Sequence, residues 1–180
     1  MPCDDLPPYD DARLVAEMEL MPEWFLKRHL GFSSECDDWD VVEMAFRSLA
    51  NSAEHQPQAF VHRDFHSRNL LVTIANNPGI LDFQDAVRGP VTYDLVSLLR
   101  DCYIAWPDER VYAWVEAFRI KSEQAGQPPV GAETFRRAFD LMGLQRHIKV
   151  LGIFCRLWYR DGKAGYLKDQ ITPATLKSNK

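Results

Sequence analysis

The chain has 180 residues, of which 46% are hydrophobic and 26% charged, and its formal net charge is −5. This composition is ordinary for a soluble globular protein with its own core, and the acidic balance argues against a nucleic-acid-binding surface or attraction to an anionic membrane. No apolar run reaches the roughly 18 residues of a membrane span, and the acidic start of the chain is unlike a signal peptide.

Two helical pieces are predicted near the start of the chain. Asp10 is a suitable amino-terminal cap, and apolar residues recur at helical spacing from Leu14 to Met21. Pro22 should kink or split this helix, because proline lacks the backbone N–H that a helix interior needs. A second piece should follow and stop at Gly31, which is a typical carboxy-terminal cap.

The next helix is predicted to start at Asp37 or Asp38 and to end before Pro57. Its apolar residues follow a 3.6-residue period, so one face of the helix should be buried. This apolar stripe consists of Val42, Ala45, Phe46, Leu49 and Ala53.

Short strands are predicted in the middle of the chain, where the pattern changes. Residues 59–62, 70–74 and 80–81 are apolar and rich in strand-forming types. Residues 76–79, Asn-Asn-Pro-Gly, are typical of a turn between two of these strands. The last strand leads directly into Asp82.

Helices are predicted for the remainder of the chain, over residues 93–99, 111–123, 133–144 and 148–159. The expected fold class is therefore α+β and mostly helical, with a small cluster of β-hairpin strands that carries polar loops.

The polar loop at residues 62–69 matches H-R-D-x-x-x-x-N, the catalytic-loop pattern of phosphotransferases. In this pattern the carboxylate of Asp64 can accept or orient the proton of an attacking hydroxyl, and the amide oxygen of Asn69 can coordinate Mg²⁺. Magnesium prefers oxygen ligands, and Asp82, which opens an Asp-Phe-Gln sequence after the next hairpin, is the expected second ligand. His62 is interpreted as a buried residue that braces the loop.

Two other interpretations use the same residues. The motif match could be accidental, in a hairpin with a structural role only. Alternatively, His62, Asp64 and His66 could be ligands of a hydrolytic metal site, since alternate residues of a strand share one face. The segment is polar and poor in strand formers, however, so a loop is favoured over a strand.

Three segments together resemble the aminoglycoside phosphotransferase and choline kinase superfamily, whose fold is protein-kinase-like. They are residues 62–69, residues 81–86 and residues 89–99. Residues 62–69 and 82–90 are also similar to the bacterial cell-wall sugar kinases, which phosphorylate N-acetylmuramate and N-acetylglucosamine. The resemblance implies Asp64 as the catalytic base, Asn69 and Asp82 as magnesium ligands, and Asp94 as an acceptor of backbone hydrogen bonds that braces the catalytic loop.

The resemblance covers the chain from about Leu6 to about Tyr166. Residues 1–170 are accordingly expected to form the carboxy-terminal lobe of such a kinase, with residues 171–180 as a flexible tail. Members of the superfamily also have an amino-terminal nucleotide lobe with a phosphate-covering loop and a strand lysine. No glycine-rich phosphate loop is found here, and Lys27, the one lysine before the catalytic loop, falls in a helical pattern. We therefore expect the nucleotide lobe to be absent and the isolated chain to show little or no kinase activity.

The implied function is ATP- and Mg²⁺-dependent phosphorylation of a hydroxyl on a small molecule, most closely an amino sugar of cell-wall recycling. Arg68, Asp85 and Arg88 are candidate contacts to the sugar or phosphate, although each could equally be a solvated loop charge. The alternatives are an aminoglycoside, choline or homoserine-type kinase, or a non-catalytic interaction module derived from a kinase.

Four scattered cysteines without a C-x-x-C pair favour reduced thiols and a cytoplasmic location. The sequence does not indicate an oligomeric state.

Overall fold

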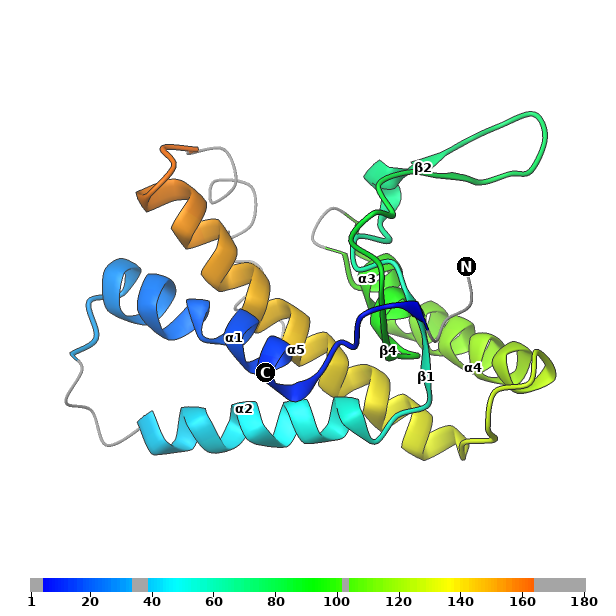
Figure 1. Cartoon of the computed structure of the whole chain (residues 1–180), viewed down its shortest axis with the longest axis horizontal. Coiled ribbons are helices and arrows are strands. Elements are labelled where there is room, and N and C mark those ends of the chain that lie inside the picture. The colour runs from blue at the N-terminus through cyan, green and yellow to red at the C-terminus, as the bar shows by residue number, and fades with distance from the viewer. Residues whose placement is uncertain (1–4, 34–38, 102–103, 164–180) are drawn as a thin grey trace.

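The structure, a computed structural model, describes residues 5–33, 39–101 and 104–163. Most of these residues are helical, and α5 crosses the middle of the view in Figure 1, with α1 and α2 on one side and the strands and α4 on the other. The helical elements are α1 (Asp11–Met18), the π-helical η2 (Met21–His29), α2 (Trp39–Glu54), the short η3 (Ser67–Asn69), α3 (Tyr93–Leu99), α4 (Asp108–Gln124) and α5 (Ala132–Tyr159). The strands are β1 (Gln58–Val61), β2 (Leu70–Leu71), β3 (Gly79–Ile80) and β4 (Val87–Pro90).

The predicted helix signals at the start of the chain are confirmed. The Asp10 side chain caps α1 by accepting a hydrogen bond from the backbone N–H of Arg13 at 3.0 Å. Pro22 lies in the first turn of η2, where the missing N–H costs little. Gly31 follows the end of η2 with a φ of 74°, a left-handed conformation that glycine adopts readily. The wider π-helical winding of η2 was not predicted.

The predicted apolar stripe of α2 is largely correct. Phe46, Leu49 and Ala53 are buried, but Ala45 is exposed, so its assignment to the stripe was wrong. Ala50 is buried instead, because it is four residues from Phe46 and so lies on the same face of the helix. The predicted start at Asp37 or Asp38 lies outside the described residues.

The strands form two small antiparallel pairs, β1 with β4 and β2 with β3. The predicted strand over residues 70–74 was too long, since β2 ends at Leu71. Val72 is 97% exposed and lies in the long loop that projects beyond β2 in Figure 1, where no neighbouring strand is available for pairing. Strand β4 was missed because its Gly89 and Pro90 are poor strand formers. Gly89 packs so closely on Tyr9 that a Cβ would lie 3.0 Å from the tyrosine Cβ.

The carboxy-terminal helices differ from the prediction mainly in length. The prediction for α3 is confirmed, and α4 begins three residues earlier than predicted, directly after Pro107. The predicted break at residues 145–147 is wrong, because α5 is continuous through Gln145, which is 0% exposed. No helix in the described part of the chain is long and apolar enough to cross a membrane.

Gly152 allows α5 to cross η2 at very close range. A Cβ at this position would lie 2.5 Å from the backbone carbon of Leu20 and 2.6 Å from the backbone nitrogen of Met21, so the two helices would have to separate. We expect Gly152→Ala to lower the free energy of unfolding by about 1–3 kcal/mol, the usual effect of overpacking. Urea denaturation would measure the change.

Gly143 offers a matched control in the same helix. Its added Cβ would meet mainly the end of the flexible Arg100 side chain, at 3.3 Å, which can move aside. Gly143→Ala should therefore cost much less than Gly152→Ala. Equal effects of the two substitutions would show that the helix crossing does not require glycine.

Candidate functional site

Backbone hydrogen bonds place the loop of residues 62–69 beside the segment that ends in Asp82. The carbonyl oxygen of Leu81 accepts from His62 Nε2 at 2.8 Å, and the N–H of Leu81 donates to the carbonyl oxygen of Asn69 at 3.0 Å. The side-chain amide of Asn69 donates in turn to the carbonyl oxygen of Asp64 at 2.9 Å. The two polar loops are therefore connected at both ends of the first loop.

The acidic side chains of these loops are open to solvent. Asp64 and Asp82 are exposed and Asn69 is half-buried. One carboxylate oxygen of Asp82 accepts a hydrogen bond from Gln84 Nε2 at 2.7 Å. Two carboxylates and an amide oxygen are hard oxygen donors of the type that Mg²⁺ binds, usually together with substrate phosphates. The donor set is thus suited to a magnesium ion that is shared with a nucleotide.

Both loops contain a residue with an unusual backbone conformation. Arg63 has a φ of 75° and Asp82 a φ of 66°, in the left-handed region that residues with a Cβ seldom adopt. Such conformations cost about 1–3 kcal/mol each and persist where surrounding contacts fix them. Their occurrence immediately before Asp64 and at Asp82 itself is typical of residues held for a function.

Asp94, in the first turn of α3, supplies hydrogen bonds that help to fix the backbone conformation at Arg63. Its two carboxylate oxygens accept from the backbone N–H groups of His62 at 2.6 Å and Arg63 at 3.1 Å. Burial raises the pKa of Asp94 above its ordinary value, although these two hydrogen bonds act in the opposite direction. His62 is itself only 2% exposed. Both residues therefore hold the backbone that precedes Asp64.

A partly buried ionic cluster behind the loop was not found from the sequence. Glu17 of α1 pairs with Arg63 at 2.7 Å and with Lys149 of α5 at 2.9 Å, and it accepts a hydrogen bond from the Tyr9 hydroxyl. Lys149 also donates to the Tyr93 hydroxyl at 3.1 Å. The members come from four separate segments, so no local spacing in the sequence could have indicated them.

The three candidate substrate contacts are all exposed near the site. Arg68 lies in η3, Asp85 in the loop after Asp82, and Arg88 in β4. The backbone of Arg88 pairs with the start of the chain, since its N–H donates to Pro7 at 2.9 Å and its carbonyl accepts from Tyr9 at 2.8 Å. No observation tests whether these side chains contact a substrate, so that role stays a prediction.

The alternative site made of His62, Asp64 and His66 is not formed. Within residues 5–33, 39–101 and 104–163, no three histidine, cysteine or acidic side chains are grouped so that they could hold a metal ion. The segment is a loop rather than a strand, as expected, and His62 is turned toward the carbonyl oxygen of Leu81.

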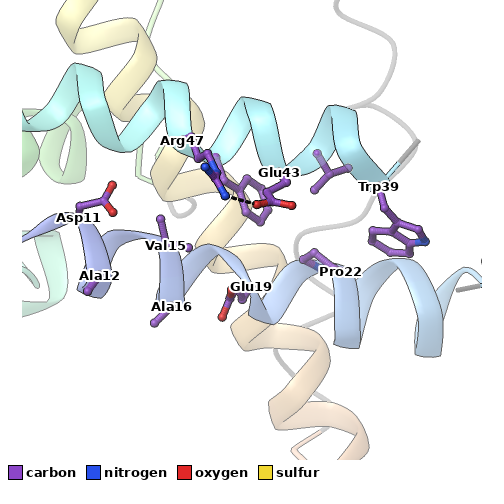
Figure 2. A pocket seen from close by; sticks show the side chains of 11 residues that line it. Asp11, Ala12, Val15, Ala16, Glu19, Pro22, Trp39, Glu43 and Arg47 are labelled. Atoms are coloured by element: carbon purple, nitrogen blue, oxygen red, sulfur yellow. Dashed lines mark hydrogen bonds and ion pairs between the residues drawn. The ribbon is translucent and has the colours of Figure 1, made fainter. Parts of the chain in front are cut away.

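Among the hollows in the described part of the structure, one of about 610 Å³ is largely apolar and lies against the loop of residues 62–69. Its lining includes His62, Phe65, Phe83 and Asp94. A second hollow, of about 550 Å³, lies mainly between α1 and α2 and is shown in Figure 2. No residue of the loop 62–69 lines this second hollow, so the first of the two is connected with the candidate site.

Known proteins of one family are similar to most of this chain. Residues 4–131 match the phosphotransferase enzyme family. The chain belongs to this family. It is 48% identical to an N-acetylmuramate/N-acetylglucosamine kinase of Pseudomonas aeruginosa and 46% identical to a kinase of the same name from Neisseria meningitidis. These matches cover 91% and 89% of the chain, respectively, and 48% of each relative, so the chain spans about half the length of these members of the family.

Proposed function

We propose that residues 1–170 form the carboxy-terminal lobe of an ATP-dependent kinase that phosphorylates an amino sugar, N-acetylmuramate or N-acetylglucosamine. The observation that carries the proposal is the hydrogen-bonded junction of the two polar loops through Leu81, which sets Asp64, Asn69 and Asp82 in neighbouring segments. The names of the relatives at 46–48% identity support the choice of sugar.

In the proposed reaction, the sugar hydroxyl oxygen forms a bond to the γ-phosphorus of ATP while the bond from that phosphorus to the bridging oxygen breaks and ADP leaves. Asp64 orients the hydroxyl and accepts its proton. Asn69 and Asp82 would hold Mg²⁺, which offsets negative charge on the phosphates when it is bound. His62 and Asp94 keep the loop in place, because transfer depends mainly on positioning and charge neutralisation.

The proposal assigns nucleotide binding to the half of the relatives that this chain does not match. Apolar side chains next to the candidate site are exposed here, including Phe60 at 51% and Phe83 at 63%. A folded partner lobe would cover such exposed apolar side chains. We accordingly expect the 180-residue chain alone to have little or no kinase activity, and we place the full-length enzyme in the cytoplasm, in cell-wall recycling.

The proposal is tested by the choice of acceptor in the full-length enzyme, in which this chain is continuous with the remaining half found in its relatives. Purified enzyme would be incubated with ATP, Mg²⁺ and N-acetylmuramate, N-acetylglucosamine, kanamycin, choline or homoserine in parallel, and the product followed by ³¹P NMR. We expect a sugar phosphate from the first two acceptors only. Phosphorylation of kanamycin, choline or homoserine alone would replace the proposed substrate, and no transfer to any acceptor would refute the kinase assignment.

A further inference from the structure

Arg146 is a half-buried cation in the middle of α5, directly behind the loop of residues 62–69. One guanidinium nitrogen donates to the carbonyl oxygen of Arg63 at 3.2 Å, and another donates to Ser97 Oγ at 2.9 Å. The guanidinium also lies over the Tyr93 ring, 4.5 Å from its centroid. The planar guanidinium of Arg146 is therefore fixed by three contacts, one with the loop and two with Ser97 and Tyr93 of α3.

The hydrogen bond from Arg146 to the Arg63 carbonyl oxygen holds the peptide plane between Arg63 and Asp64, the proposed catalytic base. The carbonyl of Arg63 and the N–H of Asp64 belong to the same rigid peptide unit. On the other side of Arg63, its own N–H is held by Asp94 at 3.1 Å. Both peptide units around a residue with a φ of 75° are thus held by charged side chains, one from α3 and one from α5.

The charge environment favours a permanently ionised group at this position. Burial lowers the pKa of Arg146, but attraction to Tyr93 and Tyr9, and then to Asp64 and Asp94, raises it above its ordinary value overall. A hydrogen bond from a charged donor to a carbonyl is stronger than one between neutral groups. A neutral side chain at this site would leave the Arg63 carbonyl held less firmly.

We propose that Arg146 is a positioning residue of the phosphoryl-transfer reaction, which acts through the Arg63 carbonyl to fix the peptide plane that carries Asp64. The inference rests on the function proposed for this loop. It assigns to α5, whose sequence contains no recognised motif, a direct part in the geometry of the catalytic loop. Because Arg146 does not contact the substrate, it should affect turnover and leave substrate binding nearly unchanged.

The test compares Arg146→Met with Arg137→Met in the full-length enzyme. Arg137 is an exposed arginine of the same helix, so its substitution is a control for a lost charge on α5. We expect kcat of Arg146→Met to fall by about 10–100-fold, the effect of a small misplacement of a reacting group. The KM values for ATP and sugar should change by less than about threefold, as for an interaction made only in the transition state. Arg137→Met should behave like the wild type.

Two further variants keep the test decisive if Arg146→Met does not fold. Arg146→Lys retains the charge but cannot bond to Arg63 and Ser97 as a fork, so it should recover only part of kcat. Ser97→Ala removes one of the two anchors and should lower kcat less, again without raising KM. Thermal unfolding of each variant shows which of them are folded.

The outcomes separate this inference from the proposed function. Folded Arg146→Met and Ser97→Ala enzymes with wild-type kcat would overturn the role of Arg146 while the kinase assignment stands. A rise in KM with unchanged kcat would also overturn it, since the residue would then act on binding. A wild-type enzyme without any phosphotransfer would instead refute the proposed function itself.

Discussion

Asp82→Ala in the full-length enzyme is expected to lower turnover by about 1,000-fold or more, because phosphoryl transfer depends on neutralising the charge of the phosphates. The substitution removes a carboxylate proposed to hold the magnesium ion, while the candidate sugar contacts Arg68, Asp85 and Arg88 are unchanged. Sugar affinity, measured by isothermal titration calorimetry, should therefore stay close to the wild-type value. A coupled assay for ADP release would measure kcat.

Asp40→Ala provides a control for the loss of an exposed aspartate elsewhere on the chain. Asp40 lies in the first turn of α2 and is exposed, so its substitution should leave kcat near the wild-type value. If Asp82→Ala retained near-normal turnover, Asp82 would not be a metal ligand and the assignment of the site would be wrong.

Glu17→Gln is expected to have the largest effect on stability. The Glu17 side chain is 14% exposed and pairs with both Arg63 and Lys149, whose side chains are 22% and 13% exposed. Removing its charge leaves two partly buried cations without their partner, which should cost about 3 kcal/mol, the lower end of the range for buried ion pairs. Urea denaturation at pH 7 would measure the loss in the free energy of unfolding.

The difference in the free energy of unfolding between the wild type and Glu17→Gln should depend on pH through the pKa of Glu17. Burial alone would raise that pKa, but the charge of Lys149 and hydrogen bonds from Tyr9 and Lys149 lower it overall. A carboxylate whose pKa is lowered in the folded protein stabilises the fold at pH values above its pKa in the unfolded chain, about 4.3. This stabilisation is lost as the pH falls through the pKa of the carboxylate in the folded protein. The difference in stability between the wild type and Glu17→Gln should therefore shrink as the pH falls below about 4.3 and disappear below the lowered pKa of Glu17 in the folded protein.

Glu19→Gln is the matched control, two residues further along the chain. Glu19 is exposed, so its neutralisation should change stability by less than about 0.5 kcal/mol at any pH. If Glu17→Gln were as stable as this control, the cluster would not contribute to holding the catalytic loop against α1 and α5.

The features that the sequence predicted correctly depend on local chemistry. Asp10 caps α1 and Gly31 follows η2 because a cap requires only a suitable residue at one position. The two neighbouring polar loops, residues 62–69 and the segment that ends in Asp82, were located for the same reason, since the motif residues lie within a short stretch of chain. The catalytic and metal-binding roles assigned to their residues stay predictions.

The features that the sequence did not predict depend on tertiary contacts. Strand β4 exists because β1 lies beside it, although Gly89 and Pro90 disfavour a strand. The polar residues 145–147 looked like a break between helices, but in α5 the side chain of Arg146 is directed to the catalytic loop and the helix continues. The Glu17 cluster joins residues more than 130 positions apart in the chain, so only the folded arrangement could reveal it.

The position of the divalent cation tests the central claim most directly. Crystals of the full-length enzyme would be grown with Mn²⁺ and a non-hydrolysable ATP analogue, and the metal located by anomalous scattering. We expect the metal peak at direct coordination distance, about 2.1 Å, from side-chain oxygens of Asn69 and Asp82, with the Asp64 carboxylate facing the γ-phosphate. A metal bound to the nucleotide but coordinated by neither residue would contradict the account.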